Sequence, residues 1–194
     1  MMRLLTLLLL FGWLAPFSLS AQCKFSVDEV DEFDSTRLVS SLPISIGLLI
    51  PSKFETIKGA KIIDQAKLLF SHSESDQDSI NSFFLTIAVP EYEYQPIDQG
   101  QNVLIALSDS TVVGLYNFPD RGTFDPATNM RLYQHTCIVP VDIFYRLSFT
   151  DVEKIRIRYA NQKKTIPLSK KQQKELKEAI RCVGEAVGFL PVKP

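Results

Sequence analysis

The chain has few of the residues on which catalytic and cofactor sites are usually built. Only 8 glycines occur among its 194 residues, and no Gly-rich phosphate loop, dinucleotide-binding fingerprint or G-x-S-x-G elbow is present. No Cys-x-x-Cys occurs, which excludes thioredoxin-type redox chemistry and cysteine-rich zinc sites. The two histidines, His72 and His135, lie far apart and in no HExxH pattern. The sequence therefore predicts no cofactor and no metal centre.

Long hydrophobic runs are absent except at the start of the chain. Residues 1–21, MMRLLTLLLLFGWLAPFSLSA, place Arg3 before an apolar stretch over residues 4–14, which is followed by Pro16 and a small-residue end at Ala21. The stretch is shorter than the about 20 residues that a membrane-spanning helix needs, and the pattern is typical of a secretory signal peptide. We expect cleavage after Ala21, with Ser20 as the alternative site.

Cleavage would leave residues 22–194, a length that suits one domain. Beyond the leader the longest apolar stretch, residues 44–50, is interrupted by Ser45 and Gly47, so we expect no transmembrane segment after cleavage. The predicted location is therefore extracytoplasmic: periplasmic, cell-surface or secreted.

Tryptophan and a surplus of positive charge are missing from the predicted domain. The only tryptophan, Trp13, lies in the leader, which weakens a carbohydrate-binding interpretation because sugar platforms favour this residue. Residues 22–194 hold 20 Lys and Arg against 22 Asp and Glu. This near balance argues against nucleic acid as a partner.

Three cysteines remain, and in an oxidising compartment three thiols suggest one disulfide and one leftover. A bridge between Cys23 and Cys182 would join the two ends of the domain and contribute about 4–5 kcal/mol in the chain-entropy model. A bridge between Cys137 and Cys182 is the alternative. Three buried, unpaired thiols are the third possibility, since free cysteine is among the most buried residue types.

Hydrophobic periodicity predicts an α+β fold, with a mainly antiparallel β-sheet or sandwich and a C-terminal α-helix packed on it. Residues 44–50 are also consistent with a short helix, although Pro43 and Pro51 bound the segment at a length typical of a strand. The predicted strands cover residues 24–30, 37–40, 44–50, 60–73, 83–89, 101–107, 111–117, 132–139, 153–159 and 165–168.

Residues 169–187 are the one long predicted helix. Ser169 is a good N-cap, Gln172 completes a capping box and Gly188 ends the helix. A four-three-four spacing places four apolar side chains on one stripe: Leu176, Ile180, Val183 and Val187. A shorter helix is predicted over residues 141–147, after Pro140.

Basic residues collect towards the C-terminal end. Residues 22–145 hold 8 basic and 17 acidic side chains, whereas residues 146–194 hold 12 basic and 5 acidic ones. Within residues 153–159, apolar positions alternate with Lys154, Arg156 and Arg158, which is typical of a strand with one wet face. These three side chains form a candidate partner-contact face, although most charged strands of this kind are simply solvated.

Two polar segments are candidate contact loops. Residues 118–129, FPDRGTFDPATN, are expected to form an exposed loop in which Asp120, Arg121 and Asp125 could contact a ligand. Residues 73–79, SESDQDS, are expected to connect two strands as a long acidic loop.

The densest run of carboxylates lies near the start of the predicted domain: Asp28, Glu29, Asp31, Glu32 and Asp34. Calcium binds several oxygens in a flexible loop, but the EF-hand pattern is not met because the glycine and the closing glutamate are missing. We therefore interpret the run as a solvated strand end.

The stretch CKFSVDEVDEFD at residues 23–34 resembles the start of small uncharacterised exported proteins from Bacteroidota-type bacteria. The order of later elements is also similar: the hairpin around residues 103–115, the strand VEKIRIRY and the terminal helix with its cysteine. This resemblance implies an exported domain and brings no catalytic residue to this chain.

These observations favour an exported, non-enzymatic protein that binds a partner or ligand in the periplasm or at the cell surface. One alternative is an extracytoplasmic hydrolase with His135 as its base, which a pocket joining His135 to a Ser, Asp or Glu would favour. Another is a structural component of an envelope assembly, for which a large exposed apolar patch would be the sign. A solvent-facing His135 beside a flat basic strand would favour the binding role.

Overall fold

A computed structural model describes residues 23–56, 59–75 and 80–189, and the predicted leader lies outside these residues. The described elements, in chain order, are β1 (Phe25–Val30), β2 (Arg37–Ser41), β3 (Ile44–Thr56), β4 (Gly59–Ser75), β5 (Ile80–Glu91), β6 (Gly100–Leu107), β7 (Val112–Asn117), β8 (Thr123–Asp125), β9 (Met130–Val139), α2 (Val141–Phe149), β10 (Val152–Arg158), β11 (Lys163–Pro167) and α3 (Lys170–Ala186).

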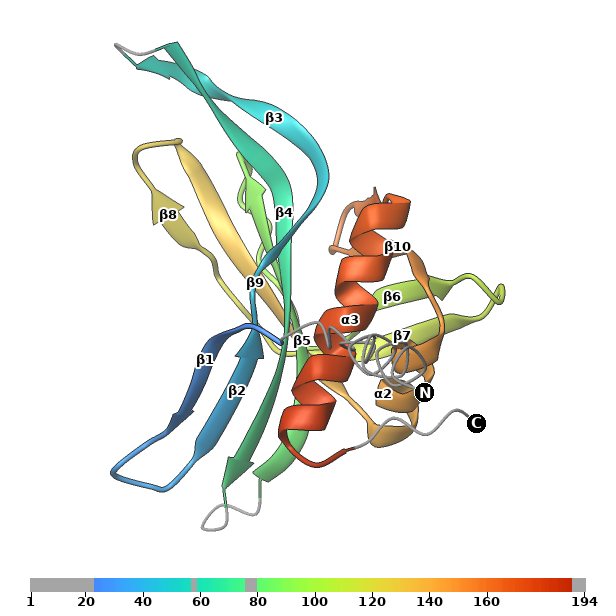
Figure 1. Cartoon of the computed structure of the whole chain (residues 1–194). Coiled ribbons are helices and arrows are strands. Elements are labelled where there is room, and N and C mark those ends of the chain that lie inside the picture. Colours follow the sequence, from blue (N-terminus) through green and yellow to red (C-terminus); the bar gives the residue numbers. More distant parts are fainter. Residues whose placement is uncertain (1–22, 57–58, 76–79, 190–194) are drawn as a thin grey trace, which may run out of the picture.

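The strands form one curved sheet in which every described pairing is antiparallel (Figure 1). The main order is β1-β2-β4-β5-β9-β7-β6-β10-β11, while β3 pairs with β4 and β8 pairs with β9. Both β2 and β3 bind β4 at successive stretches, residues 71–74 and 59–68 respectively. The predicted α+β class, with a mainly antiparallel sheet and a C-terminal helix packed on it, is confirmed.

Helix α3 lies on the concave side of the sheet, between β2, β3 and β4 on one side and β10 on the other (Figure 1). Ser169 accepts a hydrogen bond from the Gln172 backbone N–H, and the Gln172 side chain accepts one from the Ser169 N–H. This capping box was predicted, and so was the stripe, whose Leu176, Ile180 and Val183 are buried. The helix ends where Gly188 takes a φ of +80°, a conformation in which glycine carries no Cβ penalty.

Helix α2 adds an aromatic cluster to the core under α3. Phe144 stacks on Phe83 of β5, with ring centroids 4.2 Å apart, and also faces Phe70 of β4. Gly184 of α3 sits against the same ring, since a Cβ at this position would lie 2.4 Å from Phe144 Cζ. The absence of a side chain at Gly184 is therefore what lets α3 approach α2 this closely.

The prediction that Pro51 would end the third strand is wrong. Residues 44–50 are a strand, as the proline spacing favoured, but β3 continues through Pro51 to Thr56. Among the described strands β3 pairs only with β4, so it is an edge strand, where a residue without an N–H costs little.

Two expected loops are shorter than predicted. The segment 118–129 contains β8, which pairs with β9, so the expectation of an uninterrupted exposed loop is wrong. Similarly, β4 extends to Ser75 and continues to pair with β5. The rest of the predicted 73–79 loop, residues 76–79, lies outside the described residues.

Candidate functional site

The outward face of β7, β6, β10 and β11 carries the predicted basic strand residues. Ile155 and Ile157 of β10 are fully buried beneath the sheet, and Lys154 and Arg158 are exposed on its other side. Arg156 is half-buried, because it lies between the neighbouring strands with its Nε donating to Thr165 Oγ1 at 2.9 Å. Two-residue alternation alone therefore places all three basic residues on one surface.

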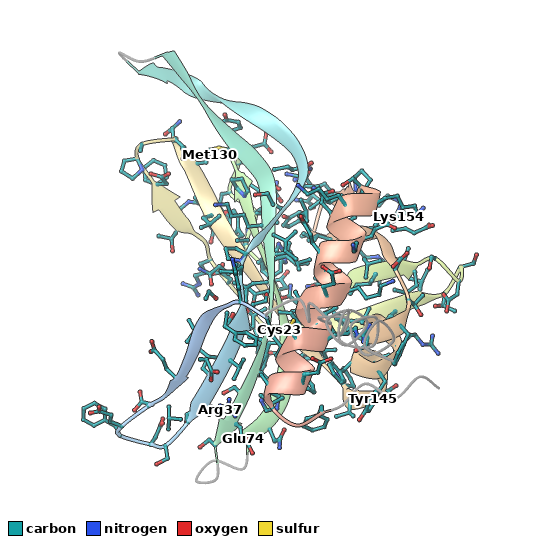
Figure 2. All side chains as sticks on the ribbon, in the orientation of Figure 1. Cys23, Arg37, Glu74, Met130, Tyr145 and Lys154 are labelled. Carbon is teal, nitrogen blue, oxygen red and sulfur yellow. A yellow bond between two sulfur atoms is a disulfide. The ribbon has the colours of Figure 1, made fainter. Side chains whose placement is uncertain are left out.

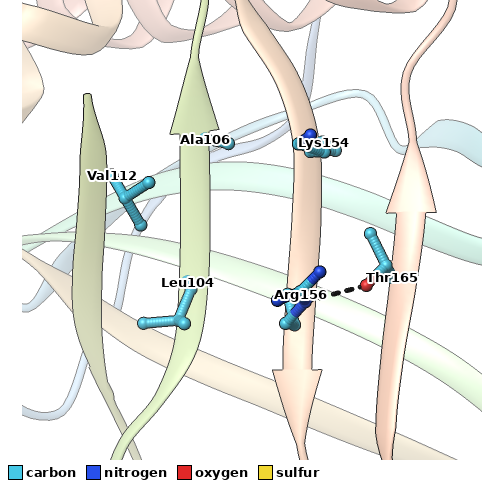
Figure 3. A pocket seen from close by; sticks show the side chains of 6 residues that line it. All are labelled: Leu104, Ala106, Val112, Lys154, Arg156 and Thr165. Carbon is cyan, nitrogen blue, oxygen red and sulfur yellow. Dashed lines mark hydrogen bonds between the residues drawn. The ribbon is translucent and has the colours of Figure 1, made fainter. Parts of the chain in front are cut away.

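Strand register brings apolar side chains from β6 and β7 beside these cations (Figure 3). The register forms two cross-strand rows. The first row contains Val112, Ala106, Lys154 and Pro167, and the second row contains Gly114, Leu104, Arg156 and Thr165. Between them lies a shallow groove of about 190 Å³ with Leu104, Ala106 and Val112 on its apolar side. We call this surface the basic groove.

The charges of the basic groove are not neutralised within the fold. Among the described residues, no ion pair involves Lys154, Arg156 or Arg158. Arg158 also lies directly opposite Lys163 in the register, and like charges in directly opposed positions destabilise a sheet. The nearest carboxylate along β10, Glu153, is exposed at a bulge at the end of the groove. An acidic ligand that extended from the groove to Arg158 would therefore relieve repulsion as well as form ion pairs.

The sequence pattern does not indicate the apolar side of the groove. The alternation of Val103, Ile105 and Leu107 implies that Leu104 and Ala106 face outward, but nothing local shows that β6 pairs with β10. These strands are separated by β7, β8, β9 and α2 along the chain. Only the tertiary pairing joins an apolar surface to the basic one.

The candidate ligand residues of the loop after β7 are engaged in holding that loop. Asp120 accepts hydrogen bonds from the backbone N–H groups of Gly122 and Gln134. Asp125 accepts from the Ala127 N–H and from Thr128 Oγ1. Arg121 is exposed. These carboxylates have a structural role as turn acceptors, and their proposed ligand contact stays a prediction.

His135 is buried in a polar network beneath the sheet rather than facing solvent. Asn117 Nδ2 donates to its Nδ1 at 3.0 Å, and its Nε2 lies 3.4 Å from the Tyr159 hydroxyl. That hydroxyl donates to Glu91, whose carboxylate also pairs with Lys164 at 2.9 Å. Among the described residues, no Ser, Asp or Glu side chain forms a hydrogen bond with His135.

Burial lowers the pKa of His135 to about 4, with Lys164 adding to the shift and Asp120 opposing it. The unfolded chain binds a proton at about pH 6.5, while the folded chain resists protonation until about pH 4. The contribution of His135 to the free energy of unfolding therefore has its full value above pH 6.5 and is lost as the pH falls towards 4.

We expect His135→Gln to remove part of the acid sensitivity of the fold. At about pH 4, wild type should have lost about 3 kcal/mol more of its unfolding free energy than the variant, each relative to its value at neutral pH. Urea unfolding across this range measures both curves. His72, Asp34 and Asp109 also have lowered pKa values, but they titrate alike in both proteins and cancel in the difference. Parallel curves would contradict this assignment.

The cysteines pair as the first of the predicted alternatives. Cys23 and Cys182 form a disulfide with a Cα–Cα distance of 5.6 Å, and Figure 2 shows Cys23 beside α3. The alternative pairing of Cys137 with Cys182 is wrong, since Cys137 is a free thiol buried on β9. Burial raises the pKa of Cys137 to about 12, which removes its nucleophilic character.

No known protein family, curated protein or solved structure matches this chain. Within the described part of the chain, neither helix has the length and apolar character needed to cross a membrane. Across the same residues, no three His, Cys, Asp or Glu side chains gather in a way that could hold a metal ion.

Proposed function

We propose that this protein is an exported, non-enzymatic binding module that binds an acidic protein segment in its basic groove. The observation that carries the proposal is the column of Lys154, Arg156 and Arg158 without ion-pair partners among the described residues. A surface of this kind raises the local concentration of anionic partners and steers their approach. The apolar side chains beside it would contribute desolvated contact area once a partner is bound.

The disulfide supports the extracytoplasmic location. Disulfides persist in oxidising compartments, and this one joins Cys23, just before β1, to Cys182 of α3. The leader-like residues 1–21 agree with the same location.

The hydrolase alternative gains no support from His135. Its side chain is only 1% exposed, so it does not face a substrate from solution. Its hydrogen-bond partners are an amide and a phenol, and burial raises the pKa of the Tyr159 hydroxyl, with Glu91 adding to the effect. This network resembles a buried polar cluster rather than a nucleophile with its base.

Binding to fluorescently labelled poly-L-glutamate tests the proposed role. We expect Arg156→Glu to weaken binding at least about tenfold, since it inverts a charge at the centre of the groove. Arg181→Glu is the matched control, because it makes the same charge change on an exposed residue of α3, away from the groove. Fluorescence anisotropy measures both affinities, with thermal melting to verify the fold.

Equal loss of binding in the two variants would show that only net charge matters and would contradict a site at the groove. Absence of binding by the wild-type protein would contradict the proposal as well. High salt should weaken the specific interaction, because the screening length falls from about 10 Å at 0.1 M to about 3 Å at 1 M.

A further inference from the structure

The hairpin of β1 and β2 projects from the sheet and displays an aromatic residue at its tip. Phe33 is 96% exposed, and Val30 beside the turn is 59% exposed. Exposed apolar side chains are common singly, but a phenylalanine almost wholly in water costs solvation free energy that burial against a partner would recover.

The turn that carries Phe33 is held in shape by its own hydrogen bonds. Asp31 Oδ1 accepts from the Phe33 N–H at 2.7 Å, and Asp34 Oδ1 accepts from the Thr36 N–H at 2.8 Å. The backbone of Asp31 closes the loop with Thr36, and Ser35 takes a φ of +59°. A turn ordered in advance loses little conformational entropy when it binds. We call residues 31–34 with this geometry the acidic tip.

The acidic tip is complementary in charge and character to the basic groove. It presents Asp31, Glu32 and Asp34 around Phe33, whereas the groove presents Lys154 and Arg156 beside apolar side chains. The groove volume of about 190 Å³ is enough for a phenyl ring, since an apolar cavity of about 150 Å³ takes up benzene.

These two surfaces cannot meet within one chain. The tip belongs to the β1 end of the sheet and the groove to the β10 end, with four strands between β2 and β6 in the main order. Figure 2 shows the same separation, with Arg37 of the hairpin and Lys154 of the groove on opposite sides of the molecule. Their complementarity can be used only between copies.

We infer that the acidic partner of the basic groove is a second copy of this chain, whose Phe33 enters the groove while its tip carboxylates pair with Lys154 and Arg156. This inference rests on the proposed binding role of the groove. The contact joins two different surfaces, so a bound pair still has one free tip on one copy and one free groove on the other. Such head-to-tail contacts build open chains unless the rotation between copies closes a ring. The protein would thus serve as a self-assembling envelope component.

Sedimentation measurements from micromolar to millimolar concentration test the inference. They use the protein in the form that is purified after any processing by the cell. Wild type should associate with increasing concentration, and high salt should reverse this. Phe33→Ser and Arg156→Glu should each lower the association constant at least about tenfold. Phe124→Ser and Arg181→Glu are the matched controls, since both alter exposed residues outside the two surfaces.

Mixing the two impaired variants gives the decisive result. The Phe33→Ser protein retains an intact groove and the Arg156→Glu protein retains an intact tip, so the mixture should form a one-to-one dimer that does not extend. Failure of the mixture to associate would overturn the head-to-tail contact, and so would wild-type association that the two variants leave unchanged.

The polyglutamate measurement separates the two proposals. If wild type binds polyglutamate through Arg156 but stays monomeric, the groove binds a different acidic protein and only the self-association is overturned. If neither interaction occurs, the binding role of the groove fails as well.

Discussion

Replacing both Cys23 and Cys182 with serine is expected to lower the free energy of unfolding by about 5 kcal/mol. The bridge spans 159 residues, and the chain-entropy model assigns the largest effects to the longest loops. For a domain of this size the loss corresponds to a fall in melting temperature of roughly 10–20 °C. Thermal unfolding followed by circular dichroism measures it.

Reductant provides the control for this prediction. It should lower the melting temperature of wild type towards that of the double variant and leave the double variant itself unchanged. Cys137 should resist alkylation in both folded proteins, because its thiol is fully buried. Identical melting of wild type with and without reductant would contradict a stabilising role for the bridge.

Phe144→Ala is expected to cost about 3–5 kcal/mol of stability, the range typical of removing a buried phenylalanine. The ring fills the space between α2, α3 and β5, where it contacts Phe83 and Gly184. Phe124→Ala is the matched control, since this side chain is 49% exposed and its loss should change stability by less than about 1 kcal/mol. Urea unfolding measures both.

Gly184→Ala then tests whether Phe144 is what requires a glycine in α3. In wild type the added methyl group would overpack the helix contact at a cost of about 1–3 kcal/mol. In the Phe144→Ala background the ring is gone and only the Phe189 carbonyl oxygen stays close, 3.0 Å from the added Cβ, so the same substitution should cost clearly less than in wild type. Additive effects in this double-mutant cycle would contradict the close packing of the two residues.

Elements with a strong local pattern could be predicted from the sequence. Helix α3 begins after Ser169 and buries Leu176, Ile180 and Val183 because its cap and spacing are local properties. The same holds for β10, where two-residue alternation separates Ile155 from Arg156. The limits of β3 could not be predicted, because Pro51 is tolerated only at the edge position that the complete sheet gives it.

Only the basic half of the candidate site could be predicted from the sequence. Lys154, Arg156 and Arg158 follow from the alternation of one strand, whereas Leu104 and Val112 join them only through the pairing of β6 with β10 and β7. Lys164 shows the reverse case. It belongs to the same basic region of the sequence, but its register position turns it inward to Glu91 and removes it from the groove.

The sequence by itself determined the class of the fold, the cap and stripe of α3 and the single wet face of β10, because each depends on residues within a few positions of one another. The tertiary structure alone decided which cysteine Cys182 joins, how deeply His135 is buried and which apolar residues border the cations. Those outcomes depend on the register between strands far apart in the chain. That register is fixed by packing the whole sheet around α3, and no local preference encodes it.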